Sequence, residues 1–134
     1  MTTPDTETLS LSSTEDVVIA RQRVRAKAVE QGFSLVDQTK LVTAASELAR
    51  NTVQHGKGGT MQIVPLSDGA RRGIRLVFED RGPGIADITL AMKDGFTSGG
   101  GLGLGLGGAK RLSNEFSLES VVGHGTTIVI ARWR

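Results

Sequence analysis

The sequence predicts an α+β domain: a two-layer α/β sandwich with a mostly antiparallel, mixed sheet and helices on one face. Apolar and polar residues alternate strictly at Ile74, Leu76 and Phe78, as expected for a half-buried strand. Two longer segments, 14–31 and 38–55, repeat apolar residues at helical spacing instead. The expected order is strand, helix, helix, strand, strand, long loop, helix, strand, strand, which favours helices packed on one face of the sheet.

Each element has a local signal. The expected elements are a strand at Leu9–Leu11, a helix from Ser13 to Gly32, a helix capped by Asp37 over 38–55, strands at 61–66 and 74–80, one helical turn near 87–93, a helix over 104–112, and strands at 116–118 and 126–133. Pro65 weakens the strand at 61–66, because proline cannot donate to a ladder. The irregular stretch 81–103 is long enough to predict either a functional lid or disorder.

Length and composition limit the function classes. A chain of 134 residues fits a single domain over 1–134, with a flexible N-terminus at 1–8. It has no cysteine, so thiolate metal sites and disulfides are excluded. A net charge of +2 and few aromatics argue against nucleic acid, although a basic stretch over 21–27 leaves this as a minor alternative. No apolar run reaches membrane-spanning length and no secretory signal begins the chain, so a cytoplasmic, soluble protein is expected.

Glu47 and Asn51 lie four residues apart on the second predicted helix. They share one stripe of that helix, separate from an apolar stripe that contains Leu41 and Leu48. Such a polar stripe ordinarily faces open solvent. The alternative is a ligand, where Asn51 would offer a neutral oxygen to Mg²⁺ and Glu47 would act as general base. His55 ends this helix and His124 lies in a turn; neither has a partner at metal-ligand spacing.

Asp80 ends an otherwise apolar strand face. Under period-two alternation it shares that face with Ile74, Leu76 and Phe78, so its carboxylate needs strong donors if buried. The adenine amino group is one suitable donor. The alternative is a strand-end Asp that caps its own Asp80–Gly84 turn.

A glycine run favours the ligand in both cases. More than half of the 18 glycines lie between Gly82 and Gly108. Bare backbone N–H groups followed by a helix N-terminus can wrap phosphate oxygens. A flexible linker is the alternative, but Leu102, Leu104 and Leu106 recur at every second position, which linkers do not show. The P-loop pattern is absent, and the G-x-G-x-x-G match at 103–108 lacks a preceding strand.

Together these motifs resemble the GHKL ATPases, which share the Bergerat nucleotide-binding fold. The resemblance rests on Glu47–Asn51, Asp80–Gly84, Gly101–Leu106 and Gly125–Thr127, in the family's order. The short chain is similar to the serine-protein kinase and anti-sigma-factor branch. Within that branch the sequence is most similar to RsbT-type switch kinases of the bacterial stressosome. The residues that carry this further resemblance lie at 37–38, 46–51, 79–85, 94–96, 110–112 and 115–118.

The resemblance implies a role for each site residue. Glu47 would be the catalytic base, Asn51 would coordinate Mg²⁺, and Asp80 would bind the adenine amino group of ATP. Gly84 would let the base approach, and Thr126 would assist through water. The other implied nucleotide-binding residues are Gly82, Gly99, Gly100, Gly101, Leu102, Gly103, Leu104 and Gly105, with a lid and glycine-rich loop over 81–103.

The same resemblance implies an ATP-dependent serine/threonine-protein kinase. Its partners would be a STAS-domain antagonist of the RsbS type and a scaffold paralogue, and, once released, an RsbU-like serine phosphatase in a stress sigma-factor pathway. The free protein would be a monomer or weak dimer that contacts neither nucleic acid nor membrane. The alternative is an RsbW- or SpoIIAB-like anti-sigma factor that sequesters a sigma subunit. An isolated histidine-kinase domain fits less well, because no suitable histidine precedes the second helix.

Overall fold

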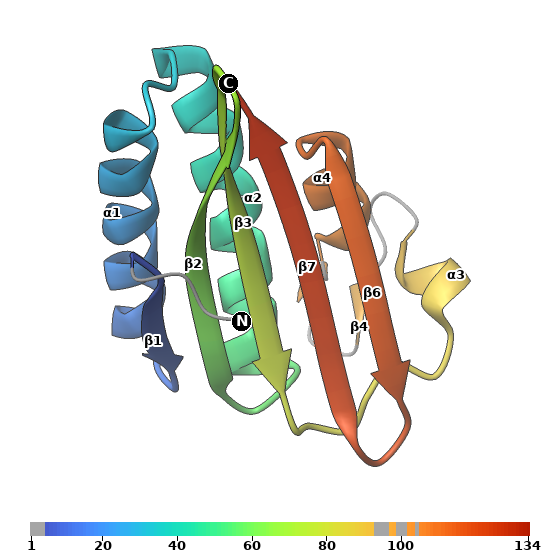
Figure 1. Cartoon of the computed structure of the whole chain (residues 1–134). Coiled ribbons are helices and arrows are strands. Elements are labelled where there is room, and N and C mark those ends of the chain that lie inside the picture. The colour runs from blue at the N-terminus through green and yellow to red at the C-terminus, as the bar shows by residue number, and fades with distance from the viewer. Residues whose placement is uncertain (1–4, 93–96, 99–101, 104) are drawn as a thin grey trace.

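The protein forms a two-layer sandwich, which confirms the expected fold class. The computed structural model describes residues 5–92, 97–98, 102–103 and 105–134. Five antiparallel strands form one sheet in the order β1–β2–β3–β7–β6. Helices α1, α2 and α4 lie on one face of this sheet (Figure 1). The elements are β1 Glu7–Leu11, α1 Thr14–Glu30, α2 Leu35–Gln54, β2 Gly59–Asp68, β3 Arg71–Asp80, α3 Ile88–Ala91, β4 Thr97–Ser98, β5 Leu102–Gly103, α4 Leu106–Arg111, β6 Glu115–Val121 and β7 Gly125–Trp133.

Helix α1 begins and ends where the sequence predicts. The Ser13 side chain accepts a hydrogen bond from the Asp16 N–H, and the Asp16 carboxylate accepts one from the Ser13 N–H, which together make a capping box. Gly32 follows the helix with a φ of +80°, the left-handed conformation that commonly terminates helices. The predicted apolar stripe is buried, namely Val17, Ala20, Val24 and Ala28.

Helix α2 begins earlier than predicted, and Asp37 is not its cap. Ser34 is the N-cap, and its side chain accepts a hydrogen bond from the Asp37 N–H at 3.1 Å. Asp37 lies inside the first turn, where its carboxylate accepts a 2.8 Å hydrogen bond from the Arg132 guanidinium of β7. Ser34 therefore satisfies the free N–H group, while Asp37 anchors the start of α2 to the sheet.

The strands are longer than their sequence signals. β2 and β3 pair over their full length, from Gly59 opposite Asp80 to Asp68 opposite Arg71. Pro65 lies within β2, but pairing with β1 ends at Ile63. On that side there is no ladder bond for Pro65 to interrupt, so the proline is tolerated.

The core lies between the sheet and the helices. Ile74, Leu76 and Phe78 of β3 are buried, as the alternation predicts, and Asp80 continues their face. Leu41 and Leu48 of α2 are fully buried in the same cluster. This packing places the C-terminal part of α2 over the end of β3 that carries Asp80.

The segment between β3 and α4 contains three short elements. Helix α3 falls within the predicted turn at 87–93, and β4 pairs with β5 in a separate two-stranded sheet. The sequence did not predict that hairpin. Of the expected phosphate-binding residues, Gly99, Gly100, Gly101 and Leu104 lie outside the described residues.

Candidate functional site

The amide oxygen of Asn51 is buried without a hydrogen-bond partner among the described residues. Asn51 lies in the last turn of α2 and is only 6% exposed. An unpaired buried oxygen costs roughly 1–3 kcal/mol, so its position calls for a partner that the described part of the chain does not supply. A hard cation that prefers oxygen ligands fits this group.

Glu47 lies one helical turn before Asn51 and is held by two neighbours. Its carboxylate forms a 3.0 Å ion pair with Arg50, three residues later on the same helix. On its other side stands Gly105, the N-cap of α4, with a φ of +70°. A Cβ atom added at Gly105 would lie 2.5 Å from Glu47 Oε2. The backbone at the start of α4, within the glycine run, therefore packs directly against the Glu47 side chain.

Asp80 is 8% exposed and accepts two backbone hydrogen bonds through one carboxylate oxygen. Oδ1 accepts from the Gly82 N–H at 2.9 Å and from the Thr126 N–H at 3.3 Å. Gly56, just beyond α2, lies so close that any Cβ there would collide with the Asp80 carboxylate. The Gly56 N–H donates to the Asn51 carbonyl at 3.0 Å. Asn51 and Asp80 are thus joined through a single residue.

The backbone at Gly84 leaves no room for a side chain. It has a φ of +78°, and a Cβ there would lie 2.6 Å from the Val121 carbonyl oxygen. Its own carbonyl lies 3.2 Å from His55 Nε2, at the end of α2. His55 is therefore a satisfied helix-end residue that fixes the turn after β3 against α2.

Thr126 lies at the same end of the sheet as Asp80, and its side chain takes part in a hydroxyl network there. It is 4% exposed and lies opposite Asp80 in the β3–β7 ladder. Its Oγ1 lies 2.9 Å from the Ser120 hydroxyl, which accepts a 2.7 Å hydrogen bond from the Ile85 N–H. The turn after Asp80 is consequently held to β6 and β7 by a short hydroxyl network.

The structure brings most predicted residues together at one end of the molecule. Glu47, Asn51, Asp80, Gly82, Gly84, Gly105 and Thr126 are linked by the contacts above, while Leu102 and Gly103 belong to β5. Sequence reasoning missed Gly56 and Ser120. Neither belongs to a recognisable motif, and only the close packing around Asp80 and Thr126 reveals them.

Two carboxyl groups of the scaffold have lowered pKa values. The Arg132 guanidinium, by hydrogen bonding, holds the pKa of the Asp37 carboxyl below its usual value. Hydrogen bonds from Ser12 lower the pKa of Asp16 in the capping box. Arg132 also donates a 2.8 Å hydrogen bond to the Leu112 carbonyl, just after α4. This arginine therefore links the start of α2, the end of α4 and β7.

Comparison with known families agrees with this arrangement. The family model described as "Histidine kinase-, DNA gyrase B-, and HSP90-like ATPase" matches residues 36–134, which span every site residue named above. The chain belongs to this family. The expected GHKL membership is thereby confirmed, and the domain is an ATPase domain of that type.

Individual relatives indicate to which branch of this ATPase family the chain is related. The chain is 49% identical to "Serine/threonine-protein kinase RsbT" of Bacillus subtilis over 118 residues, 88% of this chain and 89% of the relative. It is 28% identical over 126 residues to an "Anti-sigma F factor" of Clostridium kluyveri, covering 91% and 89%. These relatives confirm the expected enzyme class, a serine/threonine-protein kinase, and the partner-switching branch.

A solved structure agrees with the fold. The catalytic domain of histidine kinase ThkA superposes with a TM-score of 0.53, covering 94% of this chain and 95% of that one. Its sequence identity is 14%, so the likeness concerns the fold alone. None of the helices among the described residues combines the length and apolar character needed to cross a bilayer.

Proposed function

We propose that this GHKL protein uses Mg-ATP to phosphorylate a serine on a STAS-domain antagonist. The observation that carries the proposal is the buried, unpaired oxygen of Asn51, one helical turn from Glu47. The 49% identity to a relative named as a serine/threonine kinase supports the same reaction.

In this proposal Asp80 selects the base of the nucleotide. Its Oδ1 is occupied by backbone donors, so Oδ2 is the oxygen that remains for the adenine amino group. The side-chain-free backbone at Gly82 and Gly84 lets the purine approach, and the Thr126 hydroxyl holds a bridging water. The glycine-rich segment that ends at Gly105 supplies N–H groups to the phosphates.

Asn51 Oδ1 is the one protein oxygen that we assign to Mg²⁺. Bound there with the phosphates, the ion would neutralise charge on the transferred group. The fit rests on the character of the Asn51 oxygen, which is neutral, buried and without a hydrogen bond from any residue that the structure describes.

Phosphoryl transfer then needs a base beside the phosphates. The serine Oγ attacks the γ-phosphorus, its proton passes to the Glu47 carboxylate, and the new O–P bond replaces the bond to the bridging oxygen. That oxygen leaves with the electron pair on ADP. The contact between Gly105 and Glu47 supports this role, because Glu47 lies next to a residue of the glycine run. The segment 81–103 acts as the lid.

Partner switching completes the proposed function. The kinase, a monomer or weak dimer in the cytoplasm, binds its STAS-domain antagonist and a scaffold paralogue. After phosphorylating them it is released and activates an RsbU-like serine phosphatase upstream of a stress sigma factor. Neither nucleic acid nor membrane is a partner in this scheme.

A second candidate is an anti-sigma factor, which the relatives of that name favour at 28–29% identity. Both candidates use one ATP site, so only the partner distinguishes them. A pulldown from lysate that recovers a sigma subunit supports the second candidate. Recovery of a STAS protein and a phosphatase supports the first.

The direct test is incubation of the purified chain with γ-labelled ATP and cell lysate. We expect label on a serine of a STAS-domain protein, identified by mass spectrometry. Label on a histidine, or on no protein at all, would contradict the proposal.

A further inference from the structure

The basic residues of α1 divide into two sets. Arg23 and Lys27 face β1, where both contact the Glu7 carboxylate, at 2.6 and 3.9 Å. Lys27 also pairs with Glu30 at 3.1 Å. The charge of this set is therefore balanced within the chain.

Arg21 and Arg25 form the second set and have no acidic partner among the described residues. They lie four residues apart, on the other side of α1 from Arg23. Arg25 donates a 3.3 Å hydrogen bond to the neutral Gln38 amide oxygen, and Arg21 makes no bond within the described chain. Two guanidinium groups are thus left for a partner outside the chain.

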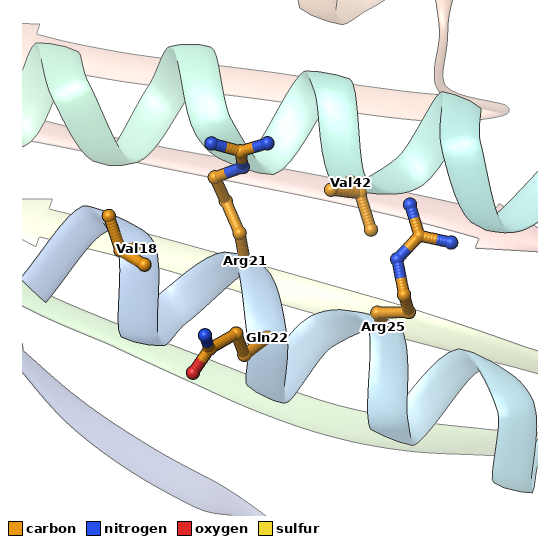
Figure 2. A pocket seen from close by; sticks show the side chains of 5 residues that line it. All are labelled: Val18, Arg21, Gln22, Arg25 and Val42. Carbon is orange, nitrogen blue, oxygen red and sulfur yellow. The ribbon is translucent and has the colours of Figure 1, made fainter.

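Both arginines border a hollow between α1 and α2. This hollow, the α1–α2 groove, has a volume of about 240 Å³ and is lined by Val18, Arg21, Gln22, Arg25 and Val42. Figure 2 shows the two arginine side chains extending from α1 toward α2. Val18 is 47% exposed, so the groove offers apolar surface beside its positive charge. An acidic segment with apolar neighbours matches that combination.

Arg50 connects the groove to the proposed catalytic base. A second hollow of about 120 Å³ shares Val18 and Arg21 with the groove and is lined further by Thr14, Val17, Arg50, Val53 and Gln54. Arg50 also forms the 3.0 Å ion pair with Glu47. A guanidinium carries five N–H donors, so Arg50 retains donors for a second acid.

We propose that the α1–α2 groove docks an acidic, apolar-flanked segment of the protein substrate, and that Arg50 positions Glu47 beside it. This inference rests on the proposed kinase function and names how that function recognises its acceptor. Arg21 and Arg25 bind the carboxylates, the exposed Val18 contacts the apolar residues, and Arg50 holds the base at the edge of the docked segment.

The test compares a groove variant with a matched control. Arg21→Gln combined with Arg25→Gln removes both unpaired charges, while Arg23→Gln removes one charge from the opposite face. The probe is the purified acceptor protein that becomes labelled in lysate. The groove variant should raise KM for the acceptor roughly tenfold, the size expected for two exposed charge contacts. Its ATP affinity, its kcat and the KM of the control should stay unchanged.

The salt dependence of KM is an independent test of the contact between the groove arginines and the acceptor. Raising the ionic strength shortens the Debye screening length from about 10 Å at 0.1 M to about 3 Å at 1 M. Charge contacts therefore weaken, and the wild-type KM for the acceptor should rise steeply with salt. The groove variant should lose most of that dependence. An unchanged KM in the groove variant, or an equal change in the control, overturns the docking surface.

Arg50→Gln tests the link to Glu47. It should lower kcat about tenfold, because a displaced catalytic group loses alignment, while ATP affinity is retained. Arg50→Lys should recover part of that loss, whereas a purely structural role would lower the melting temperature and ATP affinity instead. An unchanged kcat in Arg50→Gln overturns the positioning role.

These outcomes separate the inference from the proposed function. If the labelled acceptor lacks a STAS domain, the proposed function fails, but the groove variants still test docking with that acceptor. If a STAS protein is labelled and the groove variant has normal KM, only the docking surface fails. If no protein is labelled, both fail.

Discussion

Gly105 lies directly against Glu47. A Cβ at Gly105 would meet Glu47 Oε2 at 2.5 Å and Glu47 Cβ at 2.9 Å. The residue that starts α4 and the carboxylate in the middle of α2 therefore occupy one small space. This contact shows how a motif near position 47 and a glycine run more than fifty residues later come to lie side by side.

Glu47→Gln tests the base assigned at that contact. The amide has nearly the same size but cannot accept the serine proton, so phosphate transfer should fall by about 10²–10⁴. Mg-ATP affinity should remain within about threefold of wild type by titration calorimetry. Transfer at the wild-type rate would show that another group removes the proton.

Asp80→Asn tests recognition of adenine. Asn keeps one oxygen for the Gly82 and Thr126 N–H groups but replaces the second oxygen with a donor. Loss of a hydrogen bond to a charged group is worth about 1.5–3 kcal/mol, roughly one to two orders of magnitude in ATP affinity. Equilibrium binding of ATP and GTP should show less preference for ATP. Undiminished selectivity would place the base elsewhere.

Gly84→Ala separates steric conflict from backbone strain. Gly84 and Gly123 both have positive φ, +78° and +83°, but only Gly84 has a neighbour, Val121, in the space of a Cβ. A left-handed non-glycine residue costs roughly 1–2 kcal/mol, so Gly123→Ala should lose about that much stability. Gly84→Ala should lose clearly more, measured by urea unfolding. Equal losses would mean that the turn shifts freely away from Val121.

The ion pair between Asp37 and Arg132 should make stability depend on pH. The pKa of Asp37 is lowered in the folded state, so its contribution is full above the ordinary value of 3.8. That contribution is lost as pH falls below 3.8 through the lower folded pKa. Asp37→Asn should therefore be less stable than wild type near neutral pH, with a difference that shrinks in acid. Urea unfolding across pH 2–7 would measure it, and a difference independent of pH would contradict the assignment.

The sequence predicted the framework well where the physical signals were local. Alternation along β3 and the stripe of α1 follow directly from burial on one face. The start of α2 was mispredicted because Leu35 and Val36 are apolar yet 70% and 62% exposed, which hides the cap at Ser34. A two-residue strand such as β4 is too short to show any periodicity.

The residues of the candidate site that belong to sequence motifs were predicted, and those that matter only through packing were not. Glu47, Asn51 and Asp80 carry chemistry that a motif can reveal. Gly56 and Ser120 act only through close approach to Asp80 and Thr126, which depends on how α2, β6 and β7 pack. The spacing of Arg50 from Glu47 can be read from the sequence of one helix. Its place in the second hollow, beside Val18 and Arg21, depends on how α1 packs on α2 and was therefore passed over.

Asn51 provides the most direct test of the nucleotide site. Asn51→Ala removes an unpaired oxygen, so the nucleotide-free protein should keep its wild-type melting temperature. Mg-ATP at one hundred times the wild-type Kd should stabilise wild type by about 2.7 kcal/mol and the variant hardly at all. Calorimetric titration of Mg-ATP into both proteins decides the matter. Binding to wild type that is lost in Asn51→Ala is the predicted result, and equal affinity in the two proteins would contradict the account.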